Sequence, residues 1–168
     1  MTQAVKESLL GLLSQDVRKE IDHWVAKYPE DQKQSAVMAA LRLVQENNQG
    51  HLTTELMDAV AEYLEMPRIA VYEVATFYSM YEHKPVGRHK ICVCNSISCL
   101  LNGSEELISY LEKKLEVKPG EVTPDGKFSI KEVECLGACV GAPAMMIDKQ
   151  YYEKLTPETI DKILDELD

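Results

Sequence analysis

The segments VCNSISC, residues 93–99, and ECLGACVGAPAMM, residues 134–146, decide the fold and the chemistry of this chain of 168 residues. They carry a C-x4-C pair and a C-x3-C pair, with 35 residues between the pairs: Cys94 with Cys99, and Cys135 with Cys139. Each pair lies in a short loop at the end of a predicted β-strand. We therefore predict that the four thiolates converge and hold a metal centre.

The composition is that of a soluble folded protein. With 168 residues, 45% of them apolar, the chain can bury a core as one large domain or two small ones. No stretch reaches the roughly 20 consecutive apolar residues that span a bilayer. Residues 1–24 form a mixed-charge amphipathic segment rather than a secretory signal. We expect no membrane insertion.

The cysteines and the charge indicate a compartment and a class of partner. Without a secretory signal, paired thiols point to a reducing compartment, where they serve metals or redox chemistry more often than disulfides. We therefore expect the cytoplasm. The formal net charge of -10 repels nucleic-acid phosphates and anionic lipids. A basic protein partner suits this chain better than nucleic acid or a membrane surface.

The hydrophobic pattern divides the chain near Gly87 into a helical domain, residues 1–86, and a second domain, residues 87–168. Before the division apolar residues recur at helical spacing, and after it strand-like runs alternate with helices. The first domain is expected to hold four helices, whose apolar stripes or boundaries lie at 17–28, 36–44, 56–64 and 67–78.

The second domain has the predicted order β-α-β-β-α, which makes the fold class α+β. Ser104 and Thr156 are suitable N-caps, and acidic residues follow each of them near the positive end of a helix. Asp148-Lys149 is the expected turn of a hairpin. The expected strands are Lys90 to Cys94, Phe128 to Val133, Met145 to Ile147 and Gln150 to Tyr152.

The spacing of the thiols favours an iron-sulfur cluster over zinc. Zinc sites commonly use two short cysteine knuckles. A C-x4-C loop is similar to one that wraps a two-iron cluster, because four intervening residues let backbone N–H groups turn toward sulfur. Thioredoxin-type disulfide exchange needs C-x-x-C, which neither pair provides. The histidines share no ligand spacing with the cysteines, which argues against a Rieske centre: His23, His51, His83 and His89.

Both cysteine segments resemble the cluster-binding loops of the 24 kDa, or E, subunit family of NADH-quinone oxidoreductase, the respiratory complex I. The run VYEVATFYSMY, residues 71–81, and the following Pro85-Val86-Gly87 are similar to the helical-domain signature of that family. The likeness extends over residues 14–167.

This resemblance implies an N-terminal helical bundle followed by a thioredoxin-like [2Fe-2S] ferredoxin domain with one cluster per chain. Carried over by position, the ligands are Cys94, Cys99, Cys135 and Cys139. The resemblance further implies that the chain docks on a flavin-bearing subunit, which binds FMN and NADH. Other peripheral-arm subunits of the complex are further expected partners. The implied location is the cytoplasmic side of the inner membrane. The expected activity is single-electron exchange with that flavin. The chain offers no candidate residues for acid catalysis, hydride transfer or nicotinamide binding.

Other functions remain open on sequence alone. The module also resembles the diaphorase subunits of NAD-linked hydrogenases and formate dehydrogenases. A zinc-stapled structural adaptor would use the same four cysteines. Residues 53–78 could form a helix-turn-helix of a DNA-bound sensor, but between Leu52 and His83 the only Lys or Arg is Arg68, against six acidic residues.

Several residues near these motifs have structural interpretations. We expect Cys92 to pack in the core as a small hydrophobe, although alternation along the strand could place it on the face of Cys94. Pro143 resembles the cis-proline of thioredoxin-like folds, and a cis bond is expected there. Met145 and Met146 are expected in the core. Aromatic residues in and just after the last helix of the first domain are expected at an interface or inter-domain seam: Tyr72, Phe77, Tyr78 and Tyr81.

Overall fold

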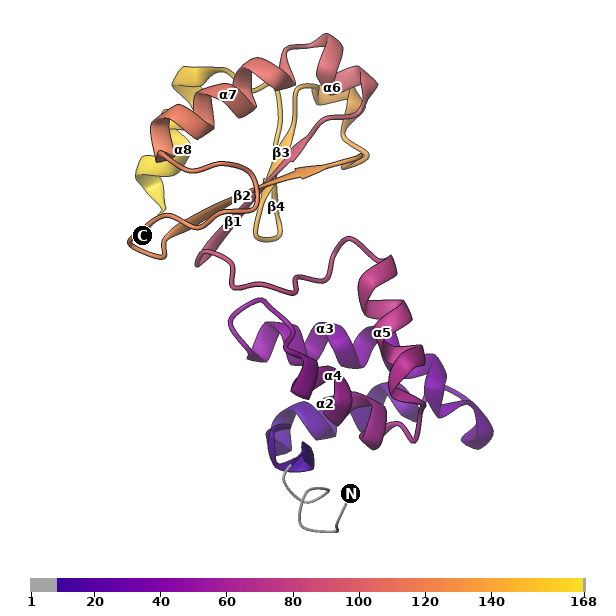
Figure 1. The fold of residues 1–168 in the computed structure, drawn as a ribbon. Coiled ribbons are helices and arrows are strands. Elements are labelled where there is room, and N and C mark those ends of the chain that lie inside the picture. Colours follow the sequence, from indigo (N-terminus) through magenta and orange to yellow (C-terminus); the bar gives the residue numbers. More distant parts are fainter. Residues whose placement is uncertain (1–8, 168) are drawn as a thin grey trace. The chain divides into compact units, whose positions relative to one another are not determined.

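The computed structural model describes residues 9–167 (Figure 1). Two compact units divide between Pro85 and Val86, next to the predicted boundary. The assignment of residues 1–86 and 87–168 as two domains stays a prediction. The start of the N-terminal amphipathic segment lies outside the described residues. Among residues 9–167, no helix combines the length and the apolar character that crossing a bilayer requires.

The described part of the first unit is helical, as predicted. Two of its helices begin at side-chain caps, because the hydroxyls of Ser14 and Thr53 accept the N–H groups of Val17 and Leu56, each at 3.3 Å. Each cap satisfies a donor that the first helical turn leaves unpaired. The helices are α2 (Gln15–Val25), the 3-10 helix η1 (Glu30–Ala36), α3 (Val37–Asn47), α4 (Thr54–Tyr63) and α5 (Arg68–Phe77).

Two features of this unit differ from the sequence prediction. The chain does not continue directly from Pro29 into an α-helix but forms η1, in which Gln32 has the non-helical angles φ -118° and ψ 30°. The polar run of η1 has no apolar stripe that an α-helix could bury. Pro67 is the N-cap of α5, with ψ 134°, rather than its first helical residue.

Tyr81 belongs to the core of the first unit, and its prediction as an interface residue was wrong. The side chain is 4% exposed, and its hydroxyl donates to the carbonyl of Met38 at 2.8 Å. Tyr72 donates to the carboxylate of Asp58 within the unit. Phe77, in contrast, is 80% exposed. The buried centre of the unit contains Ile21, Leu41, Leu52, Val60 and Val71.

The side chain of Gln45 forms hydrogen bonds to the backbone of the segment that follows α5. Its side-chain oxygen accepts the Glu82 N–H at 2.7 Å, and its amide nitrogen donates to the Met80 carbonyl at 3.2 Å. We expect Gln45→Leu to lower the free energy of unfolding of the first unit by about 1–3 kcal/mol, because two backbone groups lose their partners. Denaturant melts monitored by helical circular dichroism measure this. Gln34→Leu, the same change at an exposed position, should leave stability almost unchanged.

The second unit is a four-stranded sheet with α-helices in the order β-α-α-β-β-β-α, which has one short helix and one strand more than the predicted order β-α-β-β-α. The strands are β1 (His89–Cys94), β2 (Phe128–Val133), β3 (Met145–Ile147) and β4 (Gln150–Tyr152). The helices are α6 (Ile97–Leu101), α7 (Ser104–Leu115), the 3-10 turn η2 (Cys139–Gly141) and α8 (Pro157–Glu166).

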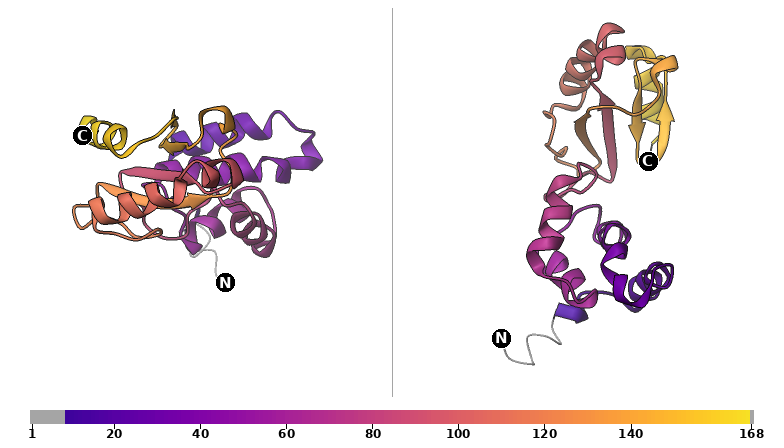
Figure 2. Two further views of the ribbon diagram at one scale, coloured as in Figure 1. Left: turned by 90° about the horizontal axis from the view of Figure 1, so that it is seen from above. Right: turned by 90° about the vertical axis from the view of Figure 1, so that its right-hand side faces the viewer.

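The sheet has the order β2-β1-β3-β4, and Figure 2 shows it from two further sides. β1 pairs in parallel with β2, whereas β3 is antiparallel to both β1 and β4. Side chains of alternate strand residues pack into one core with α7 and α8. These two helices are joined by Asp161, which accepts hydrogen bonds from Tyr110 and Lys114. The core includes Ile91, Val93, Leu111, Ile130, Met145 and Ile160.

Local details of the second unit both match and depart from expectation. The Ala142-Pro143 peptide bond is cis, as predicted. The additional helix α6 begins within the predicted loop between Cys94 and Cys99 and extends past Cys99 to Leu101. Ser104 is the first residue of α7, and Gly103 at φ +89° is its N-cap, so the prediction of a serine cap was wrong. Glycine adopts this left-handed conformation without the steric cost that a serine would incur.

Gly87 lies where the chain passes against the backbone of β2. A Cβ atom at this position would lie 2.3 Å from the carbonyl carbon of Phe128 and 2.6 Å from the nitrogen of Ser129. A side chain would therefore overlap the strand, which explains the glycine that follows Pro85-Val86.

Candidate metal centre

Parallel pairing of β1 and β2 brings the two cysteine loops to one edge of the sheet. Cys94, the last residue of β1, is the register partner of Val133, the last residue of β2. Cys135 follows two residues later. Because parallel strands end at the same edge, the C-x4-C and C-x3-C loops both begin there. The N–H of Asn95 donates to the carbonyl of Val133 at 3.0 Å and extends the pairing beyond the strands.

Cys94 and Cys99 form the buried side of this site. They are 3% and 2% exposed, and they pack together with Ala144. The short helix α6 returns the chain so that Cys99 lies beside the end of β1. Three partly buried apolar side chains pack against this buried group: Leu136, Ala138 and Ala142.

Backbone groups from both loops approach the sulfur atoms. The N–H of Gly137 donates to Sγ of Cys135 at 3.4 Å. Burial acts to raise the pKa of Cys94, but backbone hydrogen bonds from Ser96 and Leu136 and the contact with the Cys99 thiol outweigh it, so the pKa is lowered. Ser96 belongs to the first loop and Leu136 to the second. The thiolate of Cys94 is therefore stabilised by donors from both loops.

Cys99 has the opposite electrostatic behaviour. Burial raises the pKa of its thiol, and the hydrogen bond and negative charge of Cys94 and the charge of Cys139 raise it further, against a backbone hydrogen bond from Ala144. A thiolate at Cys139 would thus lie close enough to repel one at Cys99. Cys94 and Cys99 therefore contact each other, and Cys139 acts on Cys99 through its charge.

The other two cysteines face solvent. Cys135 and Cys139 are exposed, and all the cysteines are free thiols. Within residues 9–167 no three His, Cys, Asp or Glu side chains already have the geometry of a metal site. Four thiolates at this edge would repel one another, and a bound metal centre would offset that repulsion.

A family profile described as thioredoxin-like [2Fe-2S] ferredoxin matches residues 21–168. The chain belongs to this family. The E subunit of NADH-quinone oxidoreductase from Rickettsia bellii (strain RML369-C) is 48% identical over 143 residues, which are 85% of this chain and 86% of that protein. The E 2 subunit of NADH-quinone oxidoreductase from Rhizobium meliloti (strain 1021) is 41% identical over 149 residues, 89% of this chain and 87% of that protein.

The fold also matches a solved structure. The crystal structure of an NAD+-reducing [NiFe]-hydrogenase in the air-oxidized state aligns with a TM-score of 0.66 and 21% sequence identity. The alignment covers 77% of this chain and 22% of that chain. The predicted α+β class, a helical N-terminal part followed by a thioredoxin-like ferredoxin part, is confirmed.

The residues of this ferredoxin fit a two-iron cluster. Thiolates are the usual ligands of such clusters, and N–H···S hydrogen bonds around them are typical. The loops supply such donors to Cys94, Cys99 and Cys135. Sequence reasoning predicted inward N–H groups in general terms from the C-x4-C spacing. It missed the donor Leu136, whose backbone N–H reaches Cys94 of the other loop.

Cys92 and the histidines near the motifs make contacts of their own. Cys92 is 3% exposed in β1, where its register partners are Lys131 and Met146. His89 pairs with the Asp148 carboxylate at 2.9 Å, and His83 contacts the Ala75 carbonyl at 3.0 Å.

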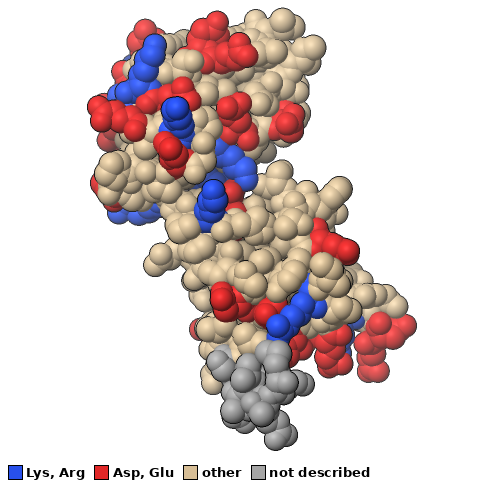
Figure 3. All heavy atoms as spheres, in the orientation of Figure 1, with Lys and Arg blue, Asp and Glu red and all other residues tan. Residues whose placement is uncertain are grey.

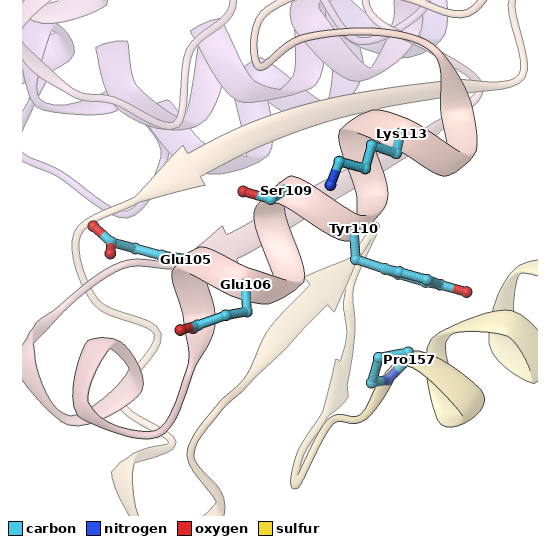
Figure 4. Close-up of a pocket in the computed structure, with 6 residues that line it drawn as sticks. All are labelled: Glu105, Glu106, Ser109, Tyr110, Lys113 and Pro157. Atoms are coloured by element: carbon cyan, nitrogen blue, oxygen red, sulfur yellow. The ribbon is translucent and has the colours of Figure 1, made fainter.

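A surface groove in the same unit is unrelated to the thiols. It lies along α7 and the start of α8 (Figure 4), where Tyr110 points toward Pro157. Its other lining residues are Glu105, Glu106, Ser109 and Lys113, so it offers charges of both signs and no soft ligand.

Proposed function

We propose that this chain is the E subunit of an NADH-quinone oxidoreductase and that it transfers single electrons through one [2Fe-2S] cluster. The cluster ligands in this proposal are Cys94, Cys99, Cys135 and Cys139. The observation that carries the proposal is the convergence of two cysteine loops at one sheet edge, with backbone donors directed at their sulfurs. The high identity to E subunits of this oxidoreductase supports the choice of complex.

The residues around the cysteines have separate roles in this mechanism. When bound, the cluster supplies a centre that accepts and releases one electron. The four thiolates hold it, and the backbone donors of Ser96, Leu136, Gly137 and Ala144 stabilise negative charge on sulfur. Leu136, Ala138 and Ala142 limit the access of water. No residue of the site is assigned a proton or hydride transfer.

Exposed apolar side chains beside both loops support docking of a partner at this edge. Ile97 is 71% exposed, Leu101 79% and Val140 101%. Clusters of exposed apolar residues commonly mark protein interfaces. The proposed partner is the flavin-bearing subunit, which would bind FMN and NADH, with other peripheral-arm subunits nearby. In this arrangement the chain lies on the cytoplasmic side of the inner membrane and is attached to it only through the complex.

The acidic surface is consistent with this assignment. Figure 3 shows Asp and Glu side chains on the visible face of each unit, in line with 28 acidic and 18 basic residues in the chain. Such a surface is poorly suited to nucleic acid. It is suited to a complementary protein surface.

A diaphorase subunit of an NAD-linked hydrogenase is the second candidate. The structural match to part of an NAD+-reducing [NiFe]-hydrogenase favours it. The sequence similarity to E subunits of NADH-quinone oxidoreductase over most of the chain favours the respiratory assignment more strongly.

The test is anaerobic purification of the full chain, followed by metal and sulfide analysis and electron paramagnetic resonance after reduction with dithionite. We expect about two irons and two sulfides per chain and one rhombic spin-half signal. A colourless protein with one zinc would refute electron transfer and establish a structural adaptor. Purification of the native complex through a tagged chain then distinguishes quinone reductase activity from hydrogenase activity.

A further inference from the structure

The segment between β4 and α8 forms backbone hydrogen bonds to the loop that carries Cys139. The N–H of Lys154 donates to the Gly141 carbonyl at 2.7 Å, and the N–H of Leu155 donates to the Pro143 carbonyl at 3.2 Å. We call residues 153–155 the strap. Lys154 has φ +51°, a left-handed conformation that is uncommon for a residue with a side chain. The surrounding structure thus holds the strap in one specific path across the loop.

Glu153 of the strap lies directly over Gly141. A Cβ atom on Gly141 would be 2.0 Å from Oε2, 2.4 Å from Cδ and 2.6 Å from Cβ of Glu153. The carboxylate occupies the space that the glycine leaves open. Gly141 is buried and ends η2, the turn that begins at Cys139. Because such a turn rises about 2 Å per residue, Gly141 lies about 4 Å along the turn from Cys139, and the carboxylate packs against the loop that carries this cysteine.

We propose that Glu153 lowers the reduction potential of the cluster by holding a negative charge against the Cys139 loop. The inference rests on the proposed function. One-electron reduction makes the cluster more negative, so a nearby carboxylate disfavours the reduced state, whereas the backbone donors favour it. Glu153 is a positioning and tuning residue and not a ligand.

The test is a redox titration of the purified chain, with the reduced cluster detected by electron paramagnetic resonance. Glu153→Gln keeps the shape of the side chain and removes its charge. At a fixed potential we expect the ratio of reduced to oxidised cluster to rise about three- to tenfold, which corresponds to roughly 30–60 mV for one electron. The iron content should equal that of the unmodified chain.

Glu116→Gln is the matched control. Glu116 follows α7, whose 12 residues lead away from the cysteine edge by about 18 Å. We expect no shift in this variant. The difference between Glu153→Gln and the unmodified chain should also shrink in 1 M salt, where the screening length falls to about 3 Å. A purely structural role would not show this dependence.

Gly141→Ala tests the packing independently. Its methyl group would displace the Glu153 side chain, so the potential should rise in the same direction. In the double variant with Glu153→Gln the rise should not exceed that of Glu153→Gln alone. An unchanged potential in Glu153→Gln, or an equal shift in Glu116→Gln, would overturn the inference and leave the cluster proposal intact. A chain that binds no cluster at all would instead refute the proposed function.

Discussion

Replacement of Cys135 by serine is expected to abolish the visible absorption of the cluster and its electron paramagnetic resonance signal. Iron content should fall from about two per chain to near zero, because a neutral hydroxyl is a poor substitute for a thiolate ligand. Cys135 is exposed, so the change removes no core contact. The helical content of the iron-free chain should therefore stay the same. Absorption spectra, iron analysis and circular dichroism of the same samples measure all three quantities.

Cys92→Ser is the control for the thiol itself. Cys92 is buried and is not assigned as a ligand, so its variant should keep the full iron content. Its stability should fall by about 1–3 kcal/mol, because a hydroxyl is more polar than the buried thiol that it replaces. Full iron content in Cys135→Ser, or loss of iron in Cys92→Ser alone, would contradict the ligand assignment. Cys99→Ser should lose both iron and stability, since Cys99 is only 2% exposed.

Leu111→Ala should cause a large loss of stability in the second unit. Leu111 lies on α7, is 0% exposed, and belongs to the core that joins both helices to the sheet. Removing three carbon atoms from such a site costs about 2–5 kcal/mol, because the cavity that remains is only partly filled. Thermal or denaturant unfolding of the protein with its cluster bound measures this loss. The decrease of the cluster absorption monitors the unfolding.

Leu101→Ala makes the same chemical change at a position that is 79% exposed. Its stability should stay within about 0.5 kcal/mol of the unmodified protein. Equal losses in both variants would mean that the core is not the one formed by α7, α8 and the sheet.

Local sequence patterns predicted most of the elements. The apolar stripes of α2, α3 and α4 and the hairpin turn at Asp148-Lys149 are visible in the sequence because each depends on neighbours within a few residues. Errors occurred where tertiary packing outweighs local preference. The polar η1 and the short α6 lack a clear apolar period, and Tyr81 is buried because its hydroxyl reaches Met38, 43 residues away.

The sequence by itself determined the number, type and spacing of the thiols, and with them the family, because spacing is a property of the chain alone. Only the tertiary structure decided that the two loops meet. Parallel pairing of β1 with β2 places both loop origins at one edge, and antiparallel β3 returns Ala144 to Cys99. The order β2-β1-β3-β4 brings side chains of β1, β2 and β3 into one core with those of α7 and α8, which are distant from them in sequence. Donors such as Leu136, and the contact of Glu153 with Gly141, follow from that order and from no local pattern.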